Sequence, residues 1–243
     1  INKRYMSINV KKSDGTLQPF DIEKIREVYK KVCHGYNVKC PFDKLEQNLS
    51  KYVVDGISTS DINKMVIKSA IELLSVQNTG WQFIAGRFAM LNIYKEASRE
   101  QEIPVSELYS PVYFLRLMHE YMGSKLYYDF TKHYTDEEII KLGKYIDSNR
   151  DMDYNYNTVT MYRRRYLLNP NNKVKELPQH MYMAIAMYLA IPEEDENRID
   201  FVKKVYDACS KAELSLPTPT LLNARTNFHQ LSSCFKFSVD DDL

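Results

Sequence analysis

Apolar side chains recur at helical spacing through most of this chain, and this pattern limits the fold more than any other feature. One stripe of this kind runs from Ile62 to Leu73, and another runs from Ile199 to Cys209. The 243 residues include only 7 glycines and 9 prolines, so tight turns are few. We therefore predict a mainly α-helical protein of one or two domains.

A β-hairpin is predicted for residues 8–20, before the first helix. Asp14-Gly15 is a two-residue turn of the kind that tolerates positive φ. Pro19 cannot donate a ladder hydrogen bond, so the second arm should be an edge strand. Asp21 is a suitable N-cap for the helix that follows.

Capping residues and apolar periodicity place the remaining elements. A polar stretch at 99–106 contains Pro104 and suggests a domain boundary near residue 100, and Leu214–Thr218 is predicted as a short buried strand between proline-rich boundaries. Thr135 begins a capping sequence, whereas residues 150–176 should be irregular. The expected helices cover about 22–34, 41–53, 59–73, 80–98, a segment after Thr135, 178–190 and 198–211.

Composition and charge exclude several classes of function. A net charge of +1 gives no general electrostatic reason to bind nucleic acid or a membrane surface. No apolar run approaches the roughly 20 residues that span a bilayer, and no signal core follows the first residues, so we expect a cytoplasmic protein. The 4 cysteines form no Cys-x-x-Cys pair and the 5 histidines show no metal-ligand spacing, so we expect no disulfide framework and no protein-bound metal.

Three lysines and a threonine in the first hundred residues have the chemistry to hold a polyphosphate together. Lys24 lies in the first turn of a predicted helix, where its charge opposes the helix dipole. A bound polyphosphate would reverse that sign, because free N–H groups and a cation would then face an anion. Lys12 in the hairpin, Thr59 at a helix start and Lys95 on the fourth helix could complete the site. Taken singly, Lys24 would be a solvated lysine and Thr59 a plain helix cap.

Four sequence segments in this region resemble the ATP-cone family. They are Val10-Lys-Lys-Ser-Asp-Gly15, Phe20-Asp-Ile-Glu-Lys-Ile25, Asp55-Gly-Ile-Ser-Thr-Ser-Asp-Ile62 and Gly86-Arg-Phe-Ala-Met-Leu-Asn-Ile-Tyr-Lys95. The resemblance implies a β-hairpin plus a four-helix bundle over residues 1–100. It also implies that ATP or dATP, with Mg²⁺, binds as an allosteric effector at Lys12, Lys24, Thr59 and Lys95. Gln18 and Asn92 differ from the Glu and His that some family members have at these positions.

Two segments near the C-terminal end, Leu216-Pro-Thr-Pro219 and Gln230-Leu-Ser-Ser-Cys234, resemble the large subunit of aerobic class I ribonucleotide reductase. The resemblance implies that Cys234 is one of two reducing, catalytic thiols and that Thr218 and Ser233 contact the substrate. Asp241 and Leu243 would begin the specificity-effector site. Residues 101–213 would form a helical region, and residues 214–243 would begin a ten-stranded α/β barrel with its first strand. A lone cysteine such as Cys209 is more simply a small buried hydrophobe.

The resemblance leads to one functional interpretation, and an alternative stays open. In the first, the chain is the N-terminal part of an enzyme that reduces ribonucleoside diphosphates to deoxyribonucleotides under ATP/dATP control. The expected partners are a small radical-generating subunit that holds a dimetal centre, a second copy of the large subunit, and thioredoxin or glutaredoxin as reductant. The segment alone would not be catalytic, because the other reactive cysteines are absent. In the alternative, the chain is a free-standing ATP/dATP-binding regulatory or oligomerisation module.

Overall fold

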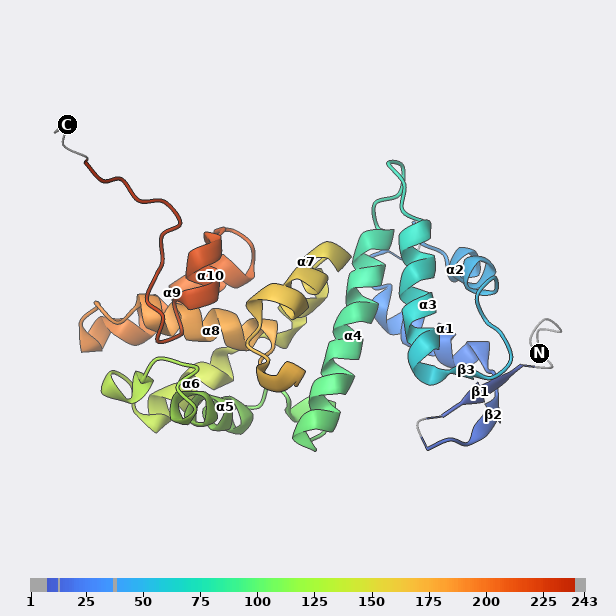
Figure 1. The fold of residues 1–243 in the computed structure, drawn as a ribbon. Helices are drawn as coiled ribbons and strands as arrows, with labels where there is room; N and C mark the ends of the chain where they lie inside the picture. Colours follow the sequence, from blue (N-terminus) through green and yellow to red (C-terminus); the bar gives the residue numbers. More distant parts are fainter. Residues whose placement is uncertain (1–7, 13, 37–38, 239–243) are drawn as a thin grey trace, which may run out of the picture. The chain divides into compact units, whose positions relative to one another are not determined.

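A computed structural model describes residues 8–12, 14–36 and 39–238 of the chain (Figure 1). It divides into two compact units. The first comprises Ile1–Lys95 with Asp151–Met161, and the second comprises Glu96–Arg150 with Tyr162–Leu243. The predicted division at residue 100 placed the segment 151–161 with the second region, whereas its contacts lie with the first.

A small sheet opens the first unit. Strands β1 (Asn9–Lys11) and β2 (Leu17–Pro19) form the predicted antiparallel hairpin, and Gly15 has a φ of 86° at its turn. The strand order is β2-β1-β3, so β2 lies at an edge, as Pro19 required. The third strand, β3 (Ile57–Ser58), pairs in parallel with β1 and was not predicted, since two residues carry no periodic signal.

Two helices of the first unit begin at capping side chains. Asp21 accepts a hydrogen bond from the backbone N–H of Glu23 at 3.0 Å, and Ser58 accepts one from Asp61 at 3.0 Å. The helix predicted for residues 41–53 is shorter than expected, since it ends at Leu49. The helices are α1 (Ile22–Val32), α2 (Phe42–Leu49), α3 (Thr59–Glu72), α4 (Trp81–Gln101) and α7 (Tyr156–Met161).

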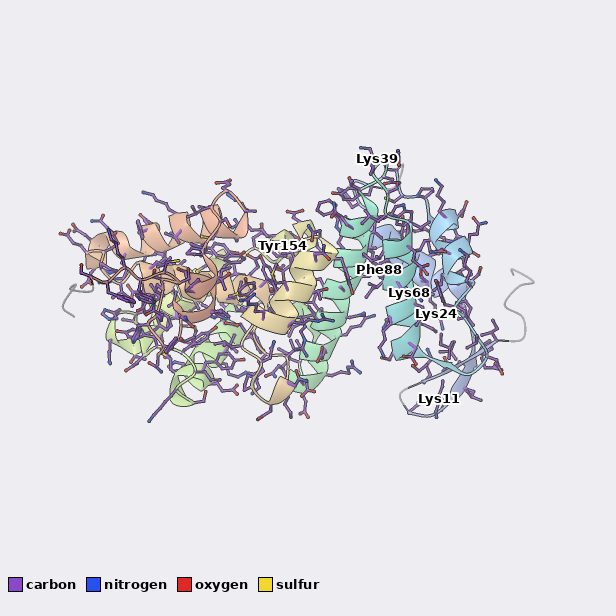
Figure 2. All side chains as sticks on the ribbon, turned by 45° about the horizontal axis from the view of Figure 1, so that its top comes forward. Lys11, Lys24, Lys39, Lys68, Phe88 and Tyr154 are labelled. Carbon is purple, nitrogen blue, oxygen red and sulfur yellow. The ribbon has the colours of Figure 1, made fainter. Side chains whose placement is uncertain are left out.

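The hydrophobic core of the first unit lies among these helices and the sheet. Leu45, Leu49 and Ile84 are fully buried, and Tyr29 packs its ring 5.2 Å from that of Phe42. Helices α3 and α4 run side by side in Figures 1 and 2. The last turns of α4, from Glu96 onward, belong to the second unit.

The second unit is also helical. Thr135 and Glu138 form the predicted capping box at the start of α6. Residues 150–176 were predicted to be irregular, which is wrong in part, because α7 and a π-helical turn, η5 (Tyr162–Tyr166), lie there. The other helices are α5 (Pro111–Gly123), α6 (Asp136–Tyr145), α8 (Pro178–Leu189), α9 (Asp195–Ser210) and α10 (Thr218–Asn223).

The predicted strand at Leu214–Thr218 is not formed. Residues 215–217 belong to no helix or strand, and Thr218 begins α10 instead. Pro219 lies in the first turn of this helix, where its missing N–H costs nothing. Leu214 is 50% exposed, so the expected burial is also absent. No barrel strand is visible among the described residues.

Candidate functional site: a cationic pocket between the sheet and three helices

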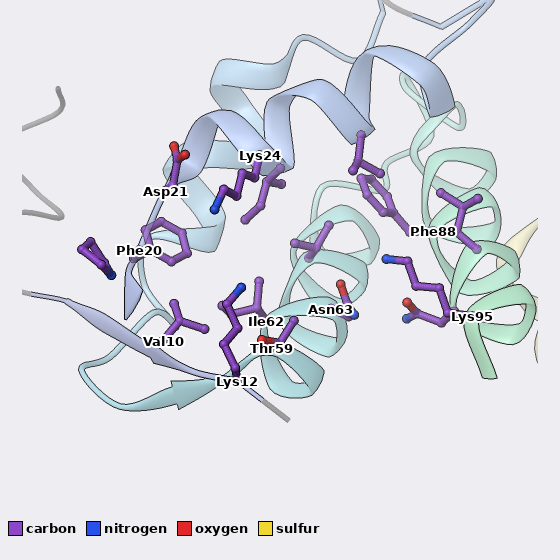
Figure 3. Close-up of a pocket in the computed structure, with 16 residues that line it drawn as sticks. Val10, Lys12, Phe20, Asp21, Lys24, Thr59, Ile62, Asn63, Phe88 and Lys95 are labelled. Atoms are coloured by element: carbon purple, nitrogen blue, oxygen red, sulfur yellow. The ribbon is translucent and has the colours of Figure 1, made fainter. Parts of the chain in front are cut away.

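The four residues predicted to bind a nucleotide line one pocket of the first unit. Lys12 follows β1, whereas Lys24, Thr59 and Lys95 lie on α1, α3 and α4. All four border this cavity of about 170 Å³ (Figure 3). Three lysines face it against a single carboxylate, that of Asp21. The pocket therefore favours an anionic ligand on charge alone.

The sheet explains why Lys12 and Thr59 meet. β1 and β3 run in parallel with Lys11 opposite Ser58, so the next residue of each strand, Lys12 and Thr59, leaves the sheet at the same end. The Thr59 hydroxyl lies 3.5 Å from the carbonyl oxygen of Lys11, which records this proximity. Thr59 is not the helix cap, since Ser58 has that role, and its hydroxyl is exposed to the pocket.

Lys24 projects into the pocket from the first turn of α1, as predicted. In Figure 3 its ammonium group points toward that of Lys12, across the mouth of the cavity. The prediction also relied on free backbone N–H groups at the start of α1. One of these, the N–H of Glu23, is not free, because the Asp21 carboxylate already accepts it. The cations, more than the helix terminus, therefore make this site attractive to an anion.

The opposite wall comes from α3 and α4. Lys95 reaches inward from α4, and Asn63 of α3 lies beside it (Figure 3). Asn92 also lines the pocket. These two carboxamides can donate and accept hydrogen bonds, as the recognition of a base edge or a ribose hydroxyl requires. Asn63 was missed from the sequence, although a polar residue four positions after Thr59 lies on the same helical face.

The deeper part of the pocket is apolar. Most of its wall residues lie between the hydrophobic core and the cavity, and Phe88, for example, is only 8% exposed. An apolar slot next to a cationic mouth suits a ligand with a flat, uncharged part and a polyanionic part. The apolar lining consists of Val10, Pro19, Phe20, Ile25, Val28, Ile62, Val66, Phe88 and Leu91.

The predicted substrate and redox residues lie in the second unit. The hydroxyl of Thr218 lies 3.1 Å from that of Tyr166, and Ser233 Oγ lies 3.7 Å from Cys234 Sγ. Cys234 is exposed, whereas burial raises the pKa of the Cys209 thiol to about 11. The structure thus separates an accessible thiol from a buried one, and the burial of Cys209 agrees with the expectation that it is a small buried hydrophobe.

Two further predictions concern the specificity-effector residues and the absence of a protein-bound metal. Asp241 and Leu243 lie outside the described residues. Among the described residues, no group of three or more His, Cys, Asp or Glu side chains is arranged to hold a metal ion. A helix that is long and apolar enough to cross a bilayer is likewise not found in this part of the chain.

Comparison with known proteins identifies both regions. Residues 8–96 match the family described as ATP cone domain, and residues 152–229 match the ribonucleotide reductase all-alpha domain. The first match contains the whole pocket. The second begins inside the segment 151–161 and ends before Ser233 and Cys234.

Curated relatives give the same result over nearly the full chain. The ribonucleoside-diphosphate reductase subunit alpha of Haemophilus influenzae is 33% identical over 240 residues, which are 98% of this chain and 31% of the relative. Subunit alpha of ribonucleoside-diphosphate reductase 1 from Escherichia coli is 32% identical over 237 residues, or 96% and 30% of the two chains. The subunit alpha of Enterobacteria phage T4 is 32% identical over 239 residues, which are 97% of this chain and 30% of the relative.

The chain thus spans about 30% of the length of these relatives. It belongs to the ribonucleotide reductase family, in which it corresponds to the N-terminal region of the alpha subunit, with an ATP cone domain followed by the all-alpha domain.

Proposed function

We propose that the first unit binds ATP or dATP, together with Mg²⁺, as an allosteric effector of a ribonucleoside-diphosphate reductase. The observation that carries this proposal is the meeting of Lys12, Lys24, Thr59 and Lys95 around one pocket with an apolar interior. The flat base would lie against the apolar wall, and the triphosphate would lie among the ammonium groups. Each charge-assisted contact of this kind contributes about 1.5–3 kcal/mol.

The larger protein of which this chain is a part would reduce ribonucleoside diphosphates to deoxyribonucleoside diphosphates. In this proposal Cys234 is one of the two thiols that reduce the substrate, and Thr218 and Ser233 contact the substrate. Asp241 and Leu243 would begin the specificity-effector site. The exposure of Cys234 supports its part in this assignment, because a thiol that alternates with a disulfide must be accessible. The partners would be the small, radical-generating subunit, further copies of the large subunit, and thioredoxin or glutaredoxin.

The nucleotide proposal predicts a specific loss for Lys24→Ala. Removal of one ammonium group that faces the phosphates should weaken ATP binding about 10- to 100-fold, which corresponds to one charge-assisted contact. Isothermal titration calorimetry with ATP and with dATP, in the presence of Mg²⁺, measures this directly. Light scattering on the same mixtures would show whether dATP changes the particle mass.

Lys30→Ala is the matched control. Lys30 lies on the same helix, is also exposed, and does not line the pocket. Its removal changes the net charge equally and should leave the dissociation constant within about twofold, since screened surface charges contribute little. Equal losses for the two variants would show that the lysines act only through general charge, and the pocket assignment would then fail.

A further inference from the structure

Helix α4 carries two interleaved sets of residues. Phe88 and Lys95 face the nucleotide pocket, whereas their chain neighbours Arg87 and Tyr94 bind the segment 151–161. Both sets lie within the first unit, to which the segment belongs. A shift or rotation of this part of α4 would therefore change the pocket and the attachment of the segment together.

The segment lies directly against the α4 backbone at Gly86. A Cβ atom at this position would lie 2.4 Å from the carbonyl oxygen of Tyr154 and 2.8 Å from the carbonyl carbon of Asn155. Such distances do not occur between non-bonded atoms, so only glycine allows this approach. Figures 1 and 2 show α7 running beside α4, and Figure 2 labels Tyr154 there. The glycine in the predicted fourth helix thus has a packing reason.

Arg87 connects α4 by hydrogen bonds to the C-terminal end of α1 and to the segment 151–161. Its Nε donates to the carbonyl oxygen of Met152 at 2.8 Å, and its Nη1 donates to the carbonyl oxygens of Val32 and His34 at 2.7 Å each. The latter two carbonyls lie at the end of α1 and just beyond it. Helix α1 also carries Lys24 at its other end, so α1, α4 and the segment share one hydrogen-bonding side chain.

Tyr94, one residue before Lys95, makes a second hydrogen bond between α4 and the segment 151–161. The hydroxyl of Tyr94 donates to the Asp151 carboxylate at 2.6 Å, and Asp151 is fully buried. A buried carboxylate is costly to leave without its donors, so this contact should hold Asp151 on α4.

We propose that nucleotide binding in the pocket and attachment of residues 151–161 to α4 stabilise each other. This inference rests on the proposed nucleotide function, and it names residues 151–161 as the segment that responds to nucleotide binding. A nucleotide that bridges α1 and α4 restricts the spacing of these helices, which is the spacing that Arg87 needs for its three carbonyl partners. By linkage, the attached segment strengthens nucleotide binding by the same factor by which the nucleotide strengthens the attachment.

The first test measures hydrogen exchange on the whole chain. Saturating ATP with Mg²⁺ should slow amide exchange of residues 151–161 several-fold, in addition to that of the pocket residues. Titration calorimetry on Gly86→Ala should then show ATP binding about tenfold weaker, within the usual range of coupling between sites. Gly123→Ala is the matched control, because a Cβ there meets nothing within 4 Å. It should bind ATP as the unchanged chain does.

A milder variant guards against misfolding of Gly86→Ala. Tyr94→Phe removes only the hydroxyl bound to Asp151 and should weaken ATP binding in the same direction, with an unchanged circular dichroism spectrum. Coupling is overturned when ATP binds the unchanged chain but leaves exchange of 151–161 unaltered, or when both variants bind ATP normally. Absence of ATP binding to the unchanged chain would instead overturn the nucleotide function, and the coupling with it.

Discussion

Replacement of Glu176 by alanine is expected to lower the free energy of unfolding by about 3–5 kcal/mol, because it leaves a charged guanidinium unpaired in the protein interior. Arg225 and Glu176 both have 0% side-chain exposure. Arg225 Nε donates to Glu176 Oε1 at 2.6 Å, and its Nη2 donates to Oε2 at 2.8 Å. This bidentate geometry is the strong form of an arginine–carboxylate pair.

The neighbours of the pair complete its hydrogen bonds. The hydroxyl of Tyr127 donates to Glu176, and the backbone N–H of Leu168 donates to the other carboxylate oxygen at 2.6 Å. Burial, and then the adjacent carboxylate, raise the pKa of Tyr127 well above its ordinary value, so this phenol remains a donor. Arg225 also donates to the carbonyl oxygen of Tyr166 at 2.6 Å. Loss of Glu176 would thus leave several buried donors without an acceptor.

Urea denaturation of the unchanged chain and of Glu176→Ala measures the effect. Glu100→Ala is the matched control, since Glu100 pairs with Lys173 at 3.5 Å in a solvent-accessible place. The control should lose no more than about 1 kcal/mol, as surface pairs do. Similar losses for the two variants would mean that the buried pair is hydrated or relaxes after mutation, contrary to this interpretation.

The sequence predicts those parts of the fold that depend on residues close together in the chain. The hairpin at Asp14-Gly15 and the capping box of Thr135 with Glu138 are local, and both are confirmed. The Glu176–Arg225 pair joins residues 49 positions apart, and no periodicity or motif connects them. The return of 151–161 to the first unit is likewise a tertiary contact.

The candidate site shows the same limit. The resemblance named Lys12, Lys24, Thr59 and Lys95, and the structure brings them to one pocket. The pocket's apolar wall consists of residues that a sequence pattern assigns simply to a core, because a core face and a pocket face have the same periodicity. The strand expected at Leu214–Thr218 was wrong for a related reason, since a short apolar run beside prolines also suits the approach to a helix.

Acidification should destabilise the second unit through His180, by about 1.4 kcal/mol for each pH unit below 6.5 and by about 4 kcal/mol at pH 3.5. His180 is fully buried on α8, with its ring 4.6 Å from that of Tyr109 and 5.7 Å from that of Phe114. Its Nδ1 accepts the backbone N–H of Leu177 at 3.3 Å, which requires an unprotonated nitrogen. Burial therefore lowers the pKa of His180 from 6.5 to about 3.

The direction of the pH effect follows from this lowered pKa. Above pH 6.5 the imidazole is neutral in both the folded and the unfolded chain, and no linkage arises. As the pH falls from 6.5 toward 3, the unfolded chain binds a proton that the folded chain does not, so stability is lost across this window.

Urea denaturation at a series of pH values measures this loss. The free energy of unfolding should fall with decreasing pH less steeply in His180→Gln, by about 1.4 kcal/mol per pH unit. His119→Gln is the control, because His119 is exposed on the surface, and its removal should not reduce the slope of acid destabilisation in the same way. Should His180→Gln fail to fold, nuclear magnetic resonance of the unchanged chain decides the matter, since an imidazole that titrates near pH 6.5 in the folded state would refute the prediction.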